Sequence, residues 1–302
     1  MDYRQLGRSE LKVSAIGLGA VTFSREIDET AAFTIMDYAL DRGINLIDTA
    51  EAYNKGGSET VVGKWIKASG KRDKLVLATK LLPPLSAERI AQAAEASLRR
   101  LQTDVIDLYQ IHAFDKNSPL DESLAALSKL VDEGKVRYLG CSNFAAWQLC
   151  KALWRAEVHS LHRLESIQPN YNLAIRDIEK ELLPLCADQQ IGVLSYSPLG
   201  AGFLTGKYSE SWRAPQGTRF DIMPDHWKIY ENPTSMARME KLRAKAAETG
   251  RSMVQLALAW VFDQPGITST LIGCRGTGHI DQAFEAASSG LSEELRKELS
   301  SW

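Results

Sequence analysis

The sequence predicts an α/β fold, specifically a (β/α)8 barrel of the TIM type. Short β-rich runs alternate with longer segments of helical period through most of the 302 residues, as in a parallel sheet with crossover helices. Eight such runs occur, which is the number of strands that closes a barrel. An open dinucleotide-binding sheet would follow Gly17 and Gly19 with a third glycine. Thr22 stands there instead, which disfavours the open alternative.

The strands are expected at runs that are short and mostly apolar. They cover residues 15–19, 45–48, 75–79, 105–111, 136–140, 165–168, 192–196 and 269–273. Ahead of the first run, residues 3–13 place the turn Gly7-Arg8-Ser9 between two short extended stretches. This pattern predicts a small β-hairpin before the barrel begins.

The helices are expected between these runs, where apolar residues recur at helical spacing. Residues 29–40 carry such a stripe, formed by Ala32, Ile35, Met36, Ala39 and Leu40. Three further segments are each preceded by a serine, a residue that favours a helix start. Ser58 precedes residues 59–68, Ser86 precedes the segment that begins near Glu88, and Ser118-Pro119 precedes residues 120–132.

Residues 200–232, after the seventh strand, interrupt the alternation with a long loop that contains Trp212 and Trp227. A loop of this length in a compact domain is usually functional or disordered. Its aromatic content favours a covering flap or an interface over disorder. Because no linker or composition shift divides the chain, we expect one domain that spans residues 1–302.

The composition narrows the classes of function. Lys and Arg number 36 and Asp and Glu number 38, so the formal net charge is -2. A nucleic-acid-binding protein usually carries a basic excess, and that class is disfavoured. The longest apolar stretches, such as 256–262, have about seven residues, far fewer than the ~20 that cross a bilayer. With a polar start that lacks a signal-peptide pattern, we expect a cytoplasmic protein with no membrane partner.

Neither the cysteines nor the paired histidines of this chain indicate a metal site. The four cysteines stand far apart and form no Cys-x-x-Cys pair, so they are expected to be buried thiols in a reducing compartment. His159 and His162 could share a helix face, but no third ligand accompanies them. We therefore expect no metal site.

Ionisable and polar side chains gather where the predicted strands end. Asp48 ends the second strand, with Tyr53 five residues later, while Lys80 ends the third and His112 the fourth. The C-terminal ends of the strands form the active-site face of such a barrel, so these four side chains should converge there. Each has a plainer explanation by itself. Asp48 could cap a turn and His112 could be structural, but four coincidences on one rim favour a common site.

The chemistry of this set is that of a proton donor to a carbonyl oxygen. Tyrosine has a pKa of about 10 and donates poorly at neutral pH unless a cation favours the phenolate. Lys80 can supply that cation, Asp48 can orient Lys80 and keep it charged, and a neutral His112 can donate a hydrogen bond to the carbonyl. No side chain can supply hydride, so a reducing cofactor is implied.

The chain resembles the aldo-keto reductase superfamily in motifs that span nearly its whole length. These are Gly43-Ile-Asn-Leu-Ile-Asp48-Thr-Ala-Glu-Ala-Tyr53, the Leu98 to His112 pattern, Gly134-Lys-Val-Arg-Tyr-Leu-Gly-Cys-Ser-Asn-Phe144 and Tyr196-Ser-Pro-Leu-Gly200. Within this superfamily, the sequence of residues 271–276 is similar to that of the branch that includes bacterial reductases and potassium-channel β-subunits. The resemblance implies a (β/α)8 barrel, NADPH, and a catalytic tetrad with Tyr53 as general acid and Asp48, Lys80 and His112 as its partners.

The resemblance also implies a set of cofactor-binding residues. Ser142, Asn143 and Gln168 would hold the nicotinamide carboxamide, Tyr196 would stack on the ring, and Gly19, Ala20, Val21 and Asp48 would border it. The pyrophosphate path would run along Ser197, Pro198, Leu199, Gly202 and Leu204, with Lys207 near a phosphate. At the adenosine end, the implied residues are Gly273, Arg275 and His279.

The adenosine end departs from the pattern of that branch. Where it usually has Gln and then Glu-Asn, this chain has His279, Gln282 and Ala283, so the contacts with adenine are reduced. Lys207 and Arg275 remain as cations for the 2′-phosphate, and free backbone N–H groups after Arg275 also favour an anion. We therefore expect NADPH to be preferred over NADH, with the phosphate carrying much of the discrimination.

The sequence favours an NADPH-dependent reductase of an aldehyde, a ketone or an oxidised sugar, reversible as an alcohol dehydrogenase. Two alternatives stay open, which are a cofactor-binding regulatory subunit with little turnover and a Schiff-base lyase that uses Lys80. A homo-oligomer is also open. Aromatic residues expected at the rim predict apolar walls for the substrate pocket, and they are Phe23, Tyr53, Phe114, Phe144 and Tyr171.

Overall fold

The strands of this chain close on themselves. Within residues 1–208 and 214–302, which the computed structural model describes, eight parallel strands form a closed barrel in the order β10-β3-β4-β5-β6-β7-β8-β9. Their bounds are β3 (Ile16–Gly19), β4 (Leu46–Asp48), β5 (Val76–Leu81), β6 (Ile106–Ile111), β7 (Val136–Ser142), β8 (Leu164–Gln168), β9 (Gly192–Tyr196) and β10 (Ser269–Gly273). The predicted (β/α)8 barrel is confirmed, and every predicted strand is present within about two residues of its bounds.

The predicted N-terminal hairpin covers the end of the barrel at which the strands begin. Strands β1 (Tyr3–Gln5) and β2 (Lys12–Ser14) pair antiparallel. Three hairpin residues, Leu6, Leu11 and Val13, are buried against inward-facing residues of the barrel strands, such as Leu108. A Cβ on Gly192 would lie only 2.4 Å from Leu6 Cδ1, so this close approach requires glycine. This plug leaves the C-terminal ends of the strands as the accessible mouth.

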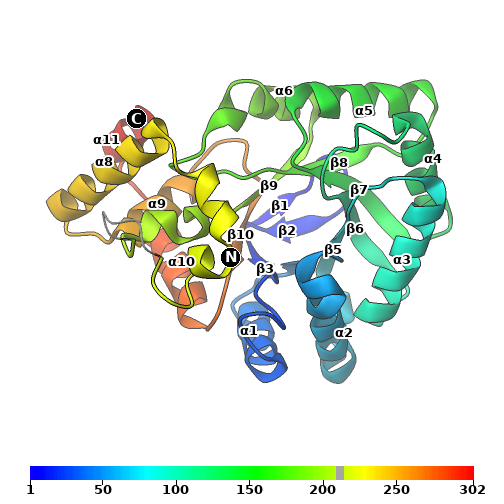
Figure 1. The fold of residues 1–302 in the computed structure, drawn as a ribbon, viewed down its shortest axis with the longest axis horizontal. Helices are drawn as coiled ribbons and strands as arrows, with labels where there is room; N and C mark the ends of the chain where they lie inside the picture. Colours follow the sequence, from blue (N-terminus) through cyan, green and yellow to red (C-terminus); the bar gives the residue numbers. More distant parts are fainter. Residues whose placement is uncertain (209–213) are drawn as a thin grey trace.

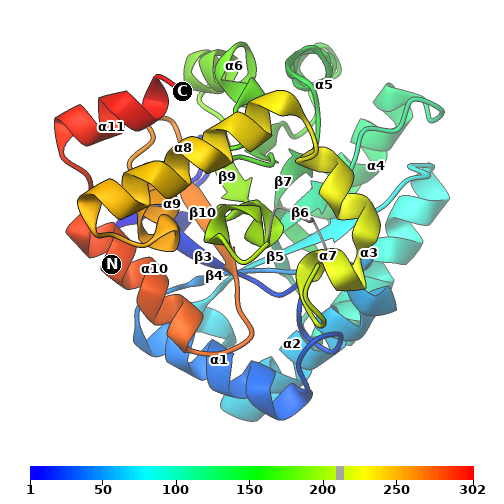
Figure 2. The same cartoon turned by 60° about the vertical axis from the view of Figure 1, so that its left-hand side comes forward.

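Helices surround the barrel, as Figures 1 and 2 show, with α1 to α6 outside the strands. The helices are α1 (Glu29–Asp41), α2 (Gly57–Ser69), α3 (Ala87–Leu101), α4 (Leu120–Asp132), α5 (Ala146–Val158), α6 (Leu182–Gln189), α7 (Arg219–Ile222), α8 (Pro233–Thr249), α9 (Met253–Phe262), α10 (Gly278–Ser289) and α11 (Glu293–Ser300). Among the described residues, no helix is long and apolar enough to span a bilayer.

The predicted helix starts fare differently. Ser86 caps α3, because its side chain accepts a hydrogen bond from the Arg89 backbone N–H. The prediction for Ser58 is wrong, since α2 begins one residue earlier and Ser58 lies buried inside its first turn. There the Ser58 hydroxyl donates to the Ala20 carbonyl oxygen at 2.7 Å. Helix α4 has its predicted bounds, but its cap is Pro119, which makes no side-chain capping bond.

The long loop after β9 contains short helical segments, which are the 3-10 helices η4 (Gly200–Thr205) and η5 (Pro224–Ile229) and the helix α7. Its aromatic residues pack together, with the Phe203 and Phe220 rings 5.8 and 5.3 Å from the Trp227 ring. Trp212 lies outside the described residues. Arg219 ties the segment to the β3–α1 loop through an ion pair with Glu26 at 3.3 Å.

Candidate active site

A buried ion pair lies at the C-terminal ends of β4 and β5. Lys80 is fully buried, and its Nζ donates to Asp48 Oδ2 at 2.5 Å and to the Thr49 carbonyl oxygen at 2.8 Å. The third bond runs to Tyr53 Oη at 3.1 Å. An ammonium group has three N–H donors, so all of them are used and the side chain has a fixed position.

The charge of Lys80 is maintained against burial. Burial, the largest single effect, would lower the pKa of Lys80. The negative charge of Asp48, together with Tyr53 and the hydrogen bonds to both groups, outweighs burial, so the net pKa is raised. Lys80 is therefore protonated throughout the physiological range.

Tyr53 is presented by a strained turn. It begins the 3-10 helix η1 (Tyr53–Gly56), in which Asn54 and Lys55 have left-handed φ angles of 48° and 53°. Such backbone is costly and persists where the surroundings hold it, here through Asn54 Nδ2, which donates to the Ser24 carbonyl oxygen at 2.8 Å. Burial raises the pKa of Tyr53, and Lys80 only partly opposes this. The phenol is thus protonated at neutral pH, and Lys80 lowers the cost of the phenolate.

His112 follows β6 and faces the same mouth. Its ring lies 5.8 Å from the Tyr53 ring in an edge-on arrangement. Burial, reinforced by the positive charge of Lys80, lowers the pKa of His112 to about 3. Its Nδ1 is buried and has no hydrogen-bond partner among the described residues. The other ring nitrogen, Nε2, is not among the buried unpartnered atoms, so a neutral imidazole can use it to hydrogen-bond a ligand beside Tyr53.

The second carboxylate oxygen of Asp48 is held by two amides. Gln168 Nε2 donates to Asp48 Oδ1 at 2.8 Å, and Gln110 Nε2 donates to the same oxygen at 3.1 Å. Gln168 was predicted as a site residue, but the sequence reasoning missed Gln110. The available signal was that Gln110 is a polar residue two positions before His112 on a mostly apolar strand.

Three predicted cofactor residues meet beside this network. Ser142 Oγ donates to the Gln168 carbonyl oxygen at 2.7 Å. Asn143 Nδ2 donates to the His112 carbonyl oxygen at 3.0 Å, and Tyr196 Oη donates to Asn143 Oδ1 at 2.8 Å. Asn143 adopts a left-handed φ of 58°. The ends of β7, β8 and β9 are thus joined to the end of β6 in one polar surface.

The loop from Ser197 to Gly206 has repeated left-handed backbone, at Ser197, Gly200, Ala201, Gly202 and Gly206. A Cβ on Gly202 would lie 2.7 Å from Lys207 Nζ, so the glycine lets the lysine lie against the loop. Partial burial and the nearby Arg275 lower the pKa of Lys207. Among the described residues, neither cation has a carboxylate partner. Uncompensated cations beside open backbone fit a phosphate.

The remaining predicted cofactor-binding residues lie on the segment after β3, on the loop after β9, at the end of β10 and at the start of α10. Near the mouth, Ala20 N donates to the Asp48 carbonyl oxygen at 2.8 Å, which places the segment Gly19 to Val21 beside β4. Pro198, Leu199 and Leu204 belong to the loop after β9, and Gly273 ends β10 in an exposed position. His279 lies in the first turn of α10, where its Nδ1 is 3.5 Å from Arg275 N.

At the adenosine end, Ala283 of α10 is completely buried, while Gln282 on the same helix is exposed. The expectation that Phe23 and Tyr171 lie at the rim is not met, because both are completely buried. Tyr171 packs on Trp260, with ring centroids 5.3 Å apart, because its loop turns back into the helical layer. Phe114 and Phe144 do form an edge-on pair, with ring centroids 5.2 Å apart.

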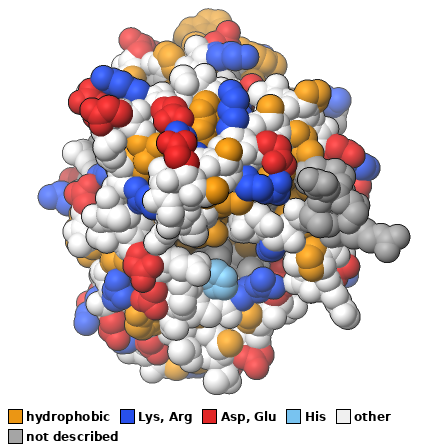
Figure 3. Space-filling model, turned by 90° about the vertical axis from the view of Figure 1, so that its left-hand side faces the viewer, with side chains coloured by type: hydrophobic (Ala, Val, Ile, Leu, Met, Phe, Trp, Pro, Cys, Tyr) orange, Lys and Arg blue, Asp and Glu red, His pale blue; other side chains and the backbone are white. Residues whose placement is uncertain are grey.

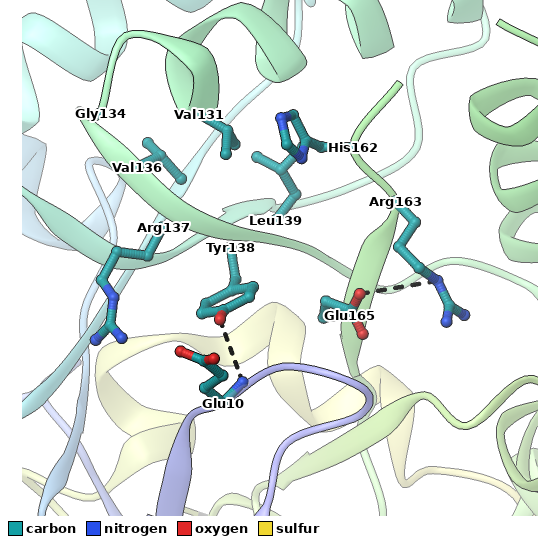
Figure 4. A pocket seen from close by; sticks show the side chains of 10 residues that line it. All are labelled: Glu10, Val131, Gly134, Val136, Arg137, Tyr138, Leu139, His162, Arg163 and Glu165. Atoms are coloured by element: carbon teal, nitrogen blue, oxygen red, sulfur yellow. Dashed lines mark hydrogen bonds and ion pairs between the residues drawn. The ribbon is translucent and has the colours of Figure 1, made fainter. Parts of the chain in front are cut away.

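The surface has two hollows. Figure 3 shows one on the face turned towards the viewer, with a histidine and Lys or Arg side chains beside it. Figure 4 shows another of about 450 Å³ next to the hairpin, where Glu10 N donates to Tyr138 Oη at 3.2 Å. It is lined by Glu10, Val131, Gly134, Val136, Arg137, Tyr138, Leu139, His162, Arg163 and Glu165. None of the four predicted catalytic residues lines it.

Comparisons with known proteins give a family match and several relatives. Residues 15–301 match the Aldo/keto reductase family. The chain is 38% identical to "Uncharacterized oxidoreductase YrpG" of Bacillus subtilis (strain 168), over 99% of this chain and 95% of the relative. It is 36% identical to "Aldo-keto reductase YhdN" of the same organism, over 99% and 92%. A "Probable voltage-gated potassium channel subunit beta" of Arabidopsis thaliana is 33% identical, over 95% and 91%.

Proposed function

This chain belongs to the aldo/keto reductase family and is an oxidoreductase, and we propose that it uses NADPH to reduce an aldehyde or ketone to the alcohol. Residues 1–302 would act as one catalytic domain. The observation that carries the proposal is the bonding of Lys80 Nζ to both Asp48 and Tyr53 at the mouth of the barrel.

The proposed roles follow from where the protons lie. Lys80 donates to Tyr53 Oη, so the phenol's own proton is free to be donated to a carbonyl oxygen. The phenolate left behind is stabilised by the Lys80 charge, which Asp48 maintains. A neutral His112 would donate a hydrogen bond to the same carbonyl oxygen and orient it.

The residues present fit NADPH. Gln168, Asn143 and Ser142 offer the donors and acceptors that a carboxamide needs, and Tyr196 offers a ring beside them. The loop after β9, with Lys207 and Arg275, suits the phosphates. When bound, NADPH supplies the hydride that no side chain can supply.

The two alternatives are less well supported. A Schiff-base lysine must be uncharged to attack a carbonyl, but the pKa of Lys80 is raised and all three of its donors are engaged. The second alternative, a regulatory subunit with little turnover, is suggested by the similarity to a potassium-channel subunit. The complete set of Asp48, Tyr53, Lys80 and His112 favours turnover.

Substitution of Tyr53→Phe tests the proposal. The variant keeps the ring but loses the donor, so kcat for carbonyl reduction should fall by about 100-fold or more. NADPH affinity, measured by calorimetry, should stay within about threefold of the wild-type value. Tyr138→Phe, far from the mouth, is the control and should keep full activity. Wild-type turnover by Tyr53→Phe would show that another group donates the proton.

A further inference from the structure

Gln110 connects the proposed catalytic and cofactor-binding residues inside the barrel. It is completely buried on β6, in register with Lys80 on β5 and Gly140 on β7. A Cβ on Gly140 would lie 3.1 Å from Gln110 Cγ, so the glycine leaves room for this side chain. Its Nε2 donates to Asp48 Oδ1 at 3.1 Å, and its Oε1 accepts from Gln168 Nε2 at 3.3 Å.

The direction of these bonds follows from Asp48. A carboxylate paired with Lys80 is ionised and can only accept, so Gln110 must turn its NH2 group towards it. The Gln110 carbonyl oxygen then faces Gln168 and accepts one of its amide protons. The other proton goes to Asp48 Oδ1 at 2.8 Å. Both donors of Gln168 are therefore engaged inside the barrel.

This arrangement leaves Gln168 Oε1 available as a hydrogen-bond acceptor at the mouth of the barrel. Gln168 Oε1 has no hydrogen-bond partner among the described residues, and it is not one of the fully buried atoms that lack a partner. We infer that Gln110 is a positioning residue, which fixes the amide of Gln168 so that Oε1 accepts from the NH2 group of the nicotinamide carboxamide. This inference rests on the proposed use of NADPH.

The same arrangement keeps Asp48 Oδ1 hydrogen-bonded. Two amides hold Asp48 Oδ1, so a shift of Gln168 towards the cofactor would leave Gln110 in place. Without Gln110, Gln168 would lose one of two anchors and Asp48 one of two amide donors. The first effect is specific to carboxamide recognition, whereas a general weakening of the barrel would affect all dinucleotides equally.

A cofactor analogue separates these effects. Calorimetry compares the Kd of NADP+ with that of its 3-acetylpyridine analogue, which lacks the carboxamide NH2 group. Wild-type protein should bind NADP+ more tightly than the analogue. Gln110→Met keeps the length of the side chain without its amide, and the ratio of the two Kd values should fall by about 2- to 10-fold, the range of one net hydrogen bond.

Two further variants keep the test decisive. Ser166→Ala removes a buried hydroxyl that has no partner among the described residues, so its Kd ratio should equal the wild-type ratio. In Gln110→Glu, a protonated carboxyl can replace both bonds of the amide. The ratio should therefore approach the wild-type value at low pH and fall as the new group ionises beside Asp48. A wild-type ratio in Gln110→Met overturns the inference alone, while failure of wild-type protein to bind NADP+ overturns the proposed function with it.

Discussion

At the scale of single residues, the mouth of the barrel shows how one charge sets the state of its neighbours. Lys80 is buried yet charged because Asp48 compensates it. That charge disfavours a second cation, and together with burial it keeps His112 neutral. It also faces the phenol of Tyr53, whose pKa burial raises. The three titrating groups are thus held as ammonium, imidazole and phenol at neutral pH.

The neutral state of His112 predicts a sensitivity to acid. Its pKa is near 6.5 in the unfolded chain and about 3 in the folded one, so between these values the unfolded chain binds more protons. The contribution of this group to stability should be complete well above pH 6.5 and fall as the pH drops towards 3, by about 1–2 kcal/mol between pH 6.5 and 5. His112→Asn should remove this part of the acid loss in urea unfolding at both pH values. His162→Asn, where 49% of the side chain is exposed, should keep it.

The sequence could predict residues whose position alone marks them. Asp48, Lys80 and His112 stand at strand ends, and strand ends are recognisable. Gln110 could not be assigned a role in this way, because its importance depends on which atoms of Asp48 remain after Lys80 is bound. Likewise, the sequence shows that Phe23 is aromatic but not that it is completely buried below the rim.

At the scale of elements, periodicity was a sufficient guide to the strands and to α1 and α4. It failed at the start of α2, where Ser58 was expected to cap the helix. A serine offers the same hydroxyl to a helix end or to a neighbouring loop, and here it bonds to Ala20 and Thr49. Tertiary contacts decided between these uses, and no local pattern contains that information.

The hairpin is the element whose removal should affect stability without affecting chemistry. Leu6 is completely buried beneath the barrel. Leu6→Ala should lower the free energy of unfolding by about 2–4 kcal/mol, because the barrel floor cannot close on the cavity. Leu82→Ala, at a residue 38% exposed, should cost less than about 1 kcal/mol. Urea unfolding of the two variants measures the difference, and equal losses would mean that the hairpin is not a structural plug.

At the scale of the whole molecule, the fold separates stability from chemistry. The hairpin closes one end of the barrel, and the other end collects side chains from β4 to β10. Residues 214–232 join two parts of that end, since Arg219 pairs with Glu26 and Arg275 Nη1 donates to the Gly217 carbonyl oxygen at 2.9 Å. With a net charge of -2, the molecule as a whole does not attract anions. Any preference for a phosphorylated cofactor must come from a local group of cations.

Lys207, after the β9 loop, and Arg275, after β10, form that local group, and their mutual repulsion is relieved when a phosphate binds. Arg275→Ala should therefore weaken NADPH binding by about 10- to 150-fold, the range of a charge-assisted contact, and leave NADH binding nearly unchanged. Calorimetric titration of both cofactors measures this. The exposed Arg99 on α3 provides a control of equal charge, and Arg99→Ala should alter neither affinity. Because Ala283 is buried and cannot contact adenine, the phosphate should account for most of the discrimination. Equal losses for NADPH and NADH in Arg275→Ala would instead assign this side chain the structural task of holding Gly217.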